Sequence, residues 1–475
     1  MATVASIPPE ILSSIFILVD VTEYTLHVFS QTQFRRTLQP DKNLSESIAL
    51  RLGCVCRRWR DVALATPALW ASLYVDLGGS AYAEGIVDGL KMHLERAKAH
   101  PLSVSLQYNT QSVSPTDIDD PDFGSLSIPS RLISLIFHRS DCIHHLALHF
   151  PYHYYGGLNP LECLSYFRGR VKNLRHLVLF TPDHGAVRTL EPFSDSSLIS
   201  SVAITITDDA PAQIPRLPFS SLTEVVLGNA GTPQVVSLLS GYPNIRVAKF
   251  SLCGNKGPSQ INSPLSLRYL ETLHLGDVDK LNASSLACLL DALMMPALKT
   301  LSLEAYEQYK CKDTRFGKVP RILVHVAALA MRSSEIESLH LKFISTGIED
   351  LILVLEKMPK LRTLDMVIKT SFGQPLTADL LRGLRREDIL PRLRDLRLAL
   401  CREEIGIEKG ALEELLKCRM NRPPEYRLQS AYLQMKQSMV PILDLQRLRE
   451  MQNEGLAVRV IMWQGKTEFL GYVRG

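Results

Sequence analysis

The sequence predicts an α/β protein in which a short N-terminal helical module precedes an irregular stack of strand–helix repeats. Parallel strands are expected on the concave side and helices on the convex side. Three observations carry this prediction: an apolar helical pattern near the N-terminus, one six-residue apolar motif that recurs ten times within residues 143–401, and prolines just before several copies of that motif. The chain is therefore divided into residues 1–72 and 73–475.

The first helix is expected to start in the string Ile-Pro-Pro-Glu-Ile-Leu at residues 7–12. Proline suits the first helical turn, where a missing N–H costs little, and a glutamate there is favourable to the helix dipole. Ile11, Leu12, Ile15 and Phe16 recur at three- and four-residue spacing. This spacing is typical of one apolar face of a helix.

The second helix is expected around the string Cys-Val-Cys-Arg-Arg-Trp-Arg at residues 54–60, which is followed by Pro-Ala-Leu-Trp. Leu52, Val55 and Trp59 are placed on one face of it by steps of three and four. Two short helices cannot bury all this apolar surface between themselves. Part of it is expected to remain as an exposed patch, and such patches usually mark partner sites.

These strings in combination resemble the F-box, the helical module that docks a protein onto the Skp adaptor of a cullin ubiquitin ligase. The F-box normally lacks the stretch at about residues 21–47, which is interpreted as an insertion. A helical cap on the following domain, with Trp59 as its core residue, is the alternative. The adaptor-binding residues that the resemblance implies are Pro8, Ile11, Leu12, Ile15, Leu52, Val55 and Trp59.

The repeated motif is apolar, two variable, apolar, one variable, apolar, as in Leu298, Leu301 and Leu303. Its internal alternation predicts a strand, and helix-compatible stretches such as 348–358 lie between copies. Proline before a copy ends the helix and favours extended backbone. The first positions of the ten copies are Ile143, Leu174, Ile199, Leu222, Ile245, Leu270, Leu298, Ile336, Leu361 and Leu393.

This pattern resembles leucine-rich repeats, which stack into a horseshoe because a single repeat cannot bury its leucines. A doubly wound sheet is the alternative, although it would not reuse one motif ten times. Residues 72–77 and 101–106, which bracket a helix at about 86–98, are expected to be the first, atypical units. The regular repeats span about 143–401, and a C-terminal cap about 402–475.

The target-binding residues are expected on the concave face, because strand residues that alternate with the leucines point away from the core. Phe180 and the group Tyr152, Tyr154 and Tyr155 are the expected anchors, since aromatic residues are enriched at hot spots. The histidines of this face come from different units and are interpreted as ordinary surface residues. The predicted concave set is His145, His149, His176, Phe180, Glu224, Lys249, His274, Glu304, His340, Lys342, Asp365, Asp395 and Arg397.

Composition favours a soluble intracellular protein. The net charge is only +4, so nucleic acid is not the expected partner. The nine cysteines are scattered, without zinc spacing or a disulfide framework, which fits a reducing compartment. Cys54 and Cys56 are expected to be buried. Neither a signal peptide nor a membrane-spanning segment is expected, and none of the common catalytic motifs occurs in the sequence.

The resulting hypothesis is a non-enzymatic adaptor, cytoplasmic or nuclear, without cofactor, metal or membrane contact. Its partners would be a Skp-family adaptor, through it a cullin, and an unknown target protein. An F-box scaffold that acts outside ubiquitination is the first alternative. A hydrolase or transferase hidden in the repeats is the second.

Overall fold

The computed structural model describes residues 7–21, 48–76, 84–107, 127–149, 167–180, 191–205, 220–252, 264–278, 283–305, 321–342, 347–368, 378–400, 408–437 and 443–463. The chain divides into two compact units, Met1–Ala230 and Gly231–Gly475. Most of the predicted insertion and the group Tyr152, Tyr154 and Tyr155 lie outside the described residues.

The first unit starts with the helices α1 (Pro9–Val21), α3 (Ile48–Gly53) and α4 (Arg57–Ala65), followed by the 3₁₀ helix η3 (Pro67–Trp70). The prediction of one continuous second helix carrying Leu52, Val55 and Trp59 is wrong. The backbone of Cys56 is extended (φ −161°, ψ 169°), and its Sγ accepts a hydrogen bond from the N–H of Trp59 at 3.4 Å. Cys56 thus caps α4, and Val55 lies in the turn between two helices.

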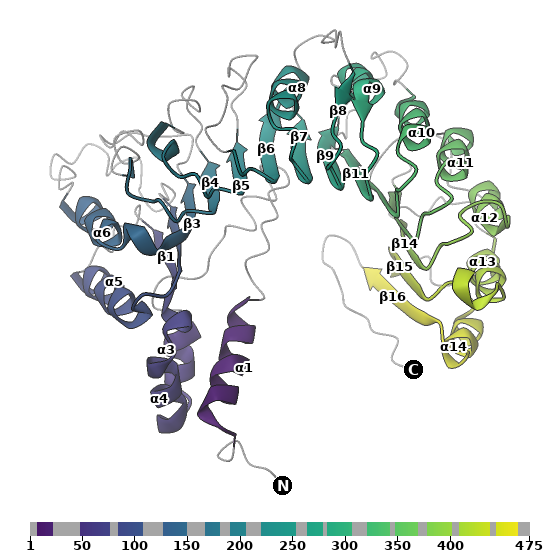
Figure 1. Ribbon diagram of the computed structural model, residues 1–475. Helices are drawn as coiled ribbons and strands as arrows, with labels where there is room; N and C mark the ends of the chain where they lie inside the picture. The colour runs from purple at the N-terminus through teal and green to yellow at the C-terminus, as the bar shows by residue number, and fades with distance from the viewer. Residues whose placement is uncertain are drawn as a thin grey trace, which may run out of the picture. The chain divides into compact units, whose positions relative to one another are not determined.

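Helix α1 packs on α4 through its buried side (Figure 1). Leu12 and Phe16 are 2% and 1% exposed, and the rings of Phe16 and Trp59 are 4.9 Å apart between centroids. The hydroxyls of Ser13 and Thr66 are 3.0 Å apart, within hydrogen-bonding distance. Tertiary packing of this side therefore holds a short helix that would be marginal in isolation.

Trp70 joins the helical module to the first repeat without a linker. Its Nε1 donates to the carbonyl of Ala63 at 2.7 Å, and its ring lies 4.9 Å from that of His93 and 4.4 Å from the guanidinium carbon of Arg96. Both partners of the ring are on α5 (Glu84–Ala97), and strand β1 (Ser72–Asp76) follows η3 directly. This continuity was expected from the sequence.

The sheet of the first unit is parallel, with neighbours in chain order. The predicted atypical units at residues 72–77 and 101–106 form its first two strands. The strands after β1 are β2 (Leu102–Gln107), β3 (Ile143–His149), β4 (His176–Phe180), β5 (Ser201–Thr205) and β6 (Glu224–Ala230), and the remaining described helices are α6 (Ser127–Phe137), η7 (Ser140–Cys142) and η8 (Glu191–Phe193).

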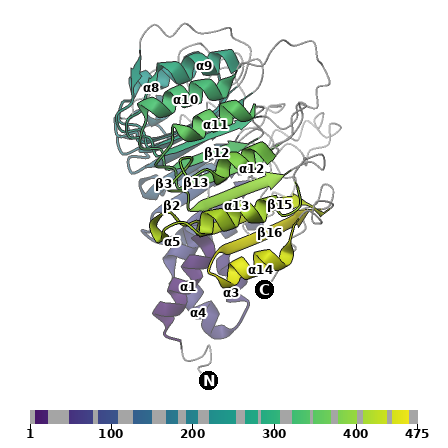
Figure 2. The same ribbon diagram turned by 90° about the vertical axis from the view of Figure 1, so that its right-hand side faces the viewer.

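The second unit contains a parallel sheet with the order β7-β9-β11-β12-β13-β14-β15-β16, and helices run along one side of it (Figures 1 and 2). Its strands are β7 (Val247–Leu252), β9 (Thr272–Val278), β11 (Thr300–Ala305), β12 (Ser338–Lys342), β13 (Thr363–Ile368), β14 (Asp395–Leu400), β15 (Ser430–Lys436) and β16 (Ala457–Trp463), with a separate pair β8 (Leu265–Ser266) and β10 (Leu293–Met294). Its helices are α8 (Thr232–Gly241), α9 (Ala283–Ala292), α10 (Ile322–Arg332), α11 (Ile348–Glu356), α12 (Ala378–Arg385), α13 (Ala411–Met420), η9 (Pro424–Tyr426) and α14 (Leu445–Asn453).

Every one of the ten motif copies leads into a strand, which confirms the prediction of leucine-rich-repeat folding within each unit. The motif's apolar positions form the core: Leu298, Leu301, Leu303 and Leu364 are 0% exposed. The stacked leucines of neighbouring repeats bury one another, as a solenoid requires.

The predicted C-terminal cap at about 402–475 contains strands of the same kind. β15 pairs in parallel with β14, and β16 with β15. β15 was not predicted, although Leu428, Ala431 and Leu433 repeat the motif spacing with alanine at the middle position, and all three are buried. The sheet of the second unit is therefore longer than the ten copies indicated.

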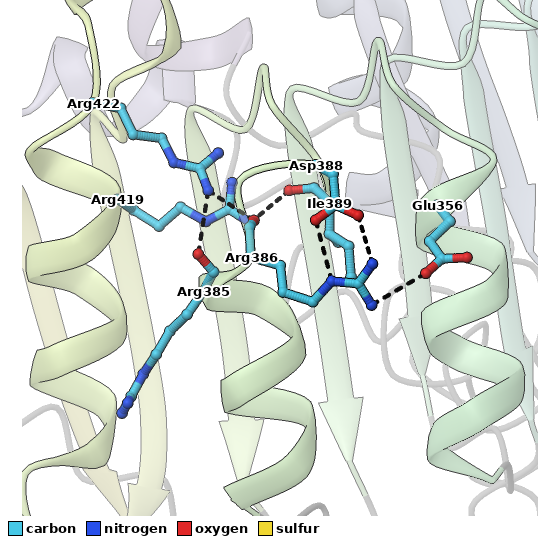
Figure 3. Close-up of polar contacts among 7 residues, drawn as sticks. All are labelled: Glu356, Arg385, Arg386, Asp388, Ile389, Arg419 and Arg422. Atoms are coloured by element: carbon cyan, nitrogen blue, oxygen red, sulfur yellow. Dashed lines mark hydrogen bonds and ion pairs between the residues drawn. The ribbon is translucent and has the colours of Figure 1, made fainter.

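Arg419 of α13 fastens this helix to the C-terminal end of α12 (Figure 3). It is 0% exposed and donates from Nε to the carbonyl of Leu384, from Nη1 to that of Leu390, and from Nη2 to that of Ile389, each at 2.7 Å. Burial lowers the pKa of Arg419 to about 10. The guanidinium is therefore a buried cation that satisfies a carbonyl in the last turn of α12 and two carbonyls between α12 and β14, with no carboxylate among these acceptors.

The basic stretch 382–386 is tied into ion pairs. Arg386 binds Asp388 at 3.1 Å from Nε and Glu356 at 3.3 Å from Nη1 (Figure 3), and Arg382 binds Asp379 at 2.7 Å. These pairs satisfy the charges locally. The expectation, drawn from the low net charge, that nucleic acid is not a partner of this chain remains a prediction.

Candidate interaction surfaces

Helix α1 has a second apolar side that the module does not bury. Ile11, Ile15 and Leu18 are 54%, 42% and 67% exposed, and their spacing of four and three residues places them on one stripe of the helix. Leu12 and Phe16, one position further along, form the buried side. We call Ile11, Ile15 and Leu18 the α1 stripe. It is an apolar surface available to another molecule.

The predicted adaptor-binding residues fall into three groups. Pro8, Ile11, Ile15 and Val55 are exposed, Val55 at 59%. Leu52 and Trp59 are half-buried. The burial of Leu12 argues against a docking contact for that residue, because its side chain belongs to the core between α1 and its neighbours. Leu18, which the sequence-based set did not include, belongs to the exposed group.

Cys54 and Cys56 are both exposed, so the prediction that they are buried small side chains is wrong. The reason is the break between α3 and α4. Cys54 lies in the turn that follows α3, Cys56 lies at the N-cap of α4, and both side chains stay accessible next to the exposed Val55. Arg60 donates from Nε to the carbonyl of Gly53 at 2.9 Å and braces this turn.

The predicted concave residues of the first unit lie in register across its strands. His145, His176, Ser201 and Glu224 are cross-strand neighbours and form one row across the sheet. His149 and Phe180 are cross-strand neighbours in a second row. The imidazole rings of His145 and His176 are 6.1 Å apart between centroids. This face therefore brings together the five residues that were expected there.

Phe180 is not the exposed anchor that was expected. It is 6% exposed and packs in an apolar cluster with Val178, Ala203 and Val226, while the ring of His149 stacks on it at 4.4 Å. The physical reason is the middle row of this face, which carries small and branched apolar residues instead of polar ones. Phe180 contributes to the packing of the first unit.

Most of the predicted residues of the second unit lie in one polar row, and the others lie in neighbouring rows. Cross-strand neighbours place Lys249, His274, Ser302, His340, Asp365 and Arg397 side by side in that order. Asp365 accepts from Nδ1 of His340 at 3.2 Å, and Lys342 of the adjacent row lies 3.5 Å from Glu304. Asp395 accepts from the hydroxyl of Ser430 at 2.6 Å.

Charge on this polar row is partly compensated within the protein. The carboxylates have internal partners, as just described, whereas Arg397 is exposed. His274 is 7% exposed, and burial, helped by Lys342 and Lys249, lowers its pKa to about 3. In the first unit, burial likewise lowers the pKa of His145 to about 4, with His176 adding to the effect. Both imidazoles are neutral at physiological pH.

The row extends beyond the predicted set. Tyr432 of β15 is the cross-strand neighbour of Arg397, and Arg459 of β16 is the neighbour of Tyr432. Sequence reasoning missed both because it ended the repeats near residue 401. The spacing Leu428, Ala431 and Leu433 is the signal that points to Tyr432 as a strand residue on the same face.

In the part of the chain that the structure describes, no three His, Cys, Asp or Glu side chains gather into a set that could hold a metal ion. Within the same ranges, no helix has the length and apolarity needed to cross a membrane.

The fold and the exposed surfaces define an interaction protein, made of a helical docking module and a leucine-rich-repeat domain. Residues 4–76 match the F-box-like family, so this part of the chain is an F-box-like domain. Domains of this kind generally bind Skp adaptors. The match extends into β1, while the division of the remaining residues into a regular domain and a cap stays a prediction.

Similar solved structures include the crystal structure of a TLR13–ssRNA13 complex, with 14% sequence identity and a TM-score of 0.32. The match covers 64% of this chain and 42% of that one, so the chain spans less than half the length of that protein. Similarity at this level does not bear on function. The comparison with curated proteins gives no match.

Proposed function

We propose that this chain is the target-recruiting subunit of a Skp–cullin–F-box ubiquitin ligase. The F-box-like domain would dock on a Skp adaptor, and the repeats would hold a target protein. The chain would contribute proximity, which raises the effective concentration of the reacting groups, and the chemistry would belong to other subunits. The cytoplasm and the nucleus are the proposed compartments.

The observation that carries this proposal is the exposed α1 stripe. A helix of a small module that already buries Leu12 and Phe16 has no internal use for three further apolar side chains. Full burial of one such side chain is worth about 1.5–3 kcal/mol. Because Ile11, Ile15 and Leu18 are partly exposed, their coverage by a partner would release several kcal/mol in total.

The polar row of the second unit supports the target-binding half of the proposal. It is a continuous face of side chains that alternate with the buried leucines, and it includes the exposed Arg397. Polar and charged residues with internal partners fix the register of a ligand rather than supply most of its affinity. The target itself is an unidentified protein.

Binding of purified Skp adaptor to the full-length chain tests the docking half. Ile15→Asp and Leu18→Asp place a charge in the α1 stripe and should each weaken binding at least about tenfold, the range of an interface hot spot. Leu12→Asp is unsuitable, because it would put a carboxylate into the core. Met331→Asp is the matched control, since Met331 is 63% exposed on α10 of the second unit.

The wild-type chain failing to bind any Skp adaptor would overturn the proposal. If the adaptor binds and the stripe variants do not, depletion of the chain in cells separates the two adaptor functions. Accumulation of a protein that is ubiquitinated in the presence of the chain supports the ligase subunit. Adaptor binding without any such protein supports a scaffold outside ubiquitination.

A further inference from the structure

Two exposed thiols flank an exposed apolar residue in the turn between α3 and α4. Cys54 follows α3, and its N–H is bonded to the carbonyls of Leu50 and Arg51 at 3.2 and 3.1 Å. Cys56 is the N-cap of α4. Val55 between them is 59% exposed. The backbone bonds hold the turn, so the thiols remain presented at the surface.

The surroundings of the thiols are cationic. Residues 48–65 contain four arginines and one acidic residue, Asp61. Arg60 donates to the carbonyl of Gly53, the residue before Cys54, and Arg57 directly follows Cys56 in the first turn of α4. Arg51, Arg57 and Arg60 are exposed. An anionic reagent is therefore concentrated at these thiols, as at any surface of one charge sign.

We propose that Cys54 and Cys56 form a modification site for glutathione, and that the modification blocks docking of the F-box-like domain. The second part rests on the proposed function. Glutathione disulfide is the reagent of matching chemistry: it is anionic, carries a disulfide, and reacts with accessible thiols. Neither thiol has a disulfide partner, so both are available.

The reaction is thiol–disulfide exchange. The cysteine thiol releases its proton to water, and the thiolate attacks one sulfur of glutathione disulfide. The disulfide bond of the reagent breaks, a mixed disulfide forms at the cysteine, and the second glutathione leaves as a thiolate that takes up a proton. The cysteine is oxidised and one glutathione is reduced. A reducing thiol reverses the reaction by the same route.

The consequence follows from position. A mixed disulfide at either cysteine puts an anionic tripeptide directly beside Val55 and covers an apolar surface with charge. At Cys56 it also crowds the Sγ that accepts from the N–H of Trp59, whose ring packs on Phe16. The modified domain would therefore expose less apolar surface to the adaptor, and the backbone at the start of α4 would be disturbed. Both effects would weaken docking.

The test treats the full-length reduced chain with glutathione disulfide, locates the modification by peptide mass spectrometry, and measures binding to purified Skp adaptor. The expected result is modification of Cys54 or Cys56 and at least about tenfold weaker binding, restored by dithiothreitol. The variant Cys54→Ser/Cys56→Ser should bind the adaptor and no longer respond to glutathione disulfide. Serine is a favourable N-cap, so α4 keeps its start.

Cys288 provides the matched control, because it is an exposed cysteine on α9 of the second unit. Cys288→Ser should leave the loss of binding by the oxidised chain unchanged. Equal binding by the reduced and modified chains would overturn the inference and leave the proposed function standing, as would modification confined to other cysteines. Absence of adaptor binding by the reduced chain would overturn the proposed function and the control of docking with it.

Discussion

Replacement of Arg419 by methionine should strongly destabilise the second unit. Methionine keeps much of the side-chain length but donates no hydrogen bond. The carbonyls of Leu384, Ile389 and Leu390 would then lose the donor that each has at 2.7 Å. The site is 0% exposed, so water cannot replace the guanidinium without rearrangement of α12 and α13.

The magnitude follows from two opposing effects. Each buried carbonyl left without a donor costs about 1–3 kcal/mol. Removal of a buried cation recovers part of its desolvation cost, which is also the cause of the lowered pKa of Arg419. The net loss in free energy of unfolding is expected to be about 3–5 kcal/mol, the range for breaking a buried charged contact. Arg419→Lys should give a smaller loss, because an ammonium still donates hydrogen bonds to some of these carbonyls. The loss should remain measurable, because an ammonium cannot reproduce the fork of the guanidinium.

Native-state hydrogen exchange is the suitable assay, since it reports the free energy of opening at individual amides. The amides of β14 and β15, between which α13 lies in the chain, should lose protection by the stated amount. Arg449→Met is the matched control, because Arg449 is exposed on α14, and it should change the opening free energy by no more than about 0.5 kcal/mol. A loss below about 1 kcal/mol for Arg419→Met would refute the argument.

Three further substitutions test the core and the titrating groups. Leu364→Ala should cost about 2–5 kcal/mol in chemical denaturation, because Leu364 is 0% exposed in the stacked core, and a cost below about 1 kcal/mol would contradict that role. Burial raises the pKa of Glu413, so its contribution to stability is lost as the pH rises above the ordinary 4.5; Glu413→Gln should therefore be the more stable protein at neutral pH, and equal pH profiles would contradict this. Burial lowers the pKa of His274 from 6.5 to about 3, so wild-type stability should fall as the pH drops below 6.5, by on the order of 2–3 kcal/mol at pH 4.5, and His274→Asn should remove that part of the acid sensitivity in pH-dependent urea unfolding.

The regular part of the fold is readable from the sequence because one motif determines both strand and core. The last two apolar positions of a copy alternate in the strand, and the first mostly lies just before it, as Leu298 does before β11. All three positions are buried, so the spacing alone fixes which residues form the core. Strand β15 was not predicted for two reasons. The middle apolar position of its motif is Ala431, where most other copies have a larger apolar residue, and Pro423 and Pro424 precede it. The volume missing at Ala431 weakens the sequence signal without preventing the pairing with β14.

The candidate surfaces were less predictable, since they depend on what else lies against a residue. Periodicity placed Leu12 and Ile15 on the same face of α1, yet 2% of one and 42% of the other is exposed. Cys54 and Cys56 were assigned to a helix interior because residue type alone gives no sign that Cys56 caps a new helix. Phe180 has the composition of an anchor, but its neighbours Val178 and Ala203 make it part of a packed cluster.

Helix α1 has two apolar sides, and only one of them is needed to hold it in the module. One side, with Leu12 and Phe16, is enough to hold the helix on α4. The other side contributes nothing to the described module and exposes apolar area to water, which is unfavourable for the isolated chain. Exposure of Ile11, Ile15 and Leu18 to water is unfavourable in the isolated chain and is relieved only when another molecule covers them. The function of this side of α1 is therefore to bind a partner. Cys54 and Cys56 lie in the turn that exposes Val55. Their oxidation by glutathione disulfide would then weaken the binding of that partner.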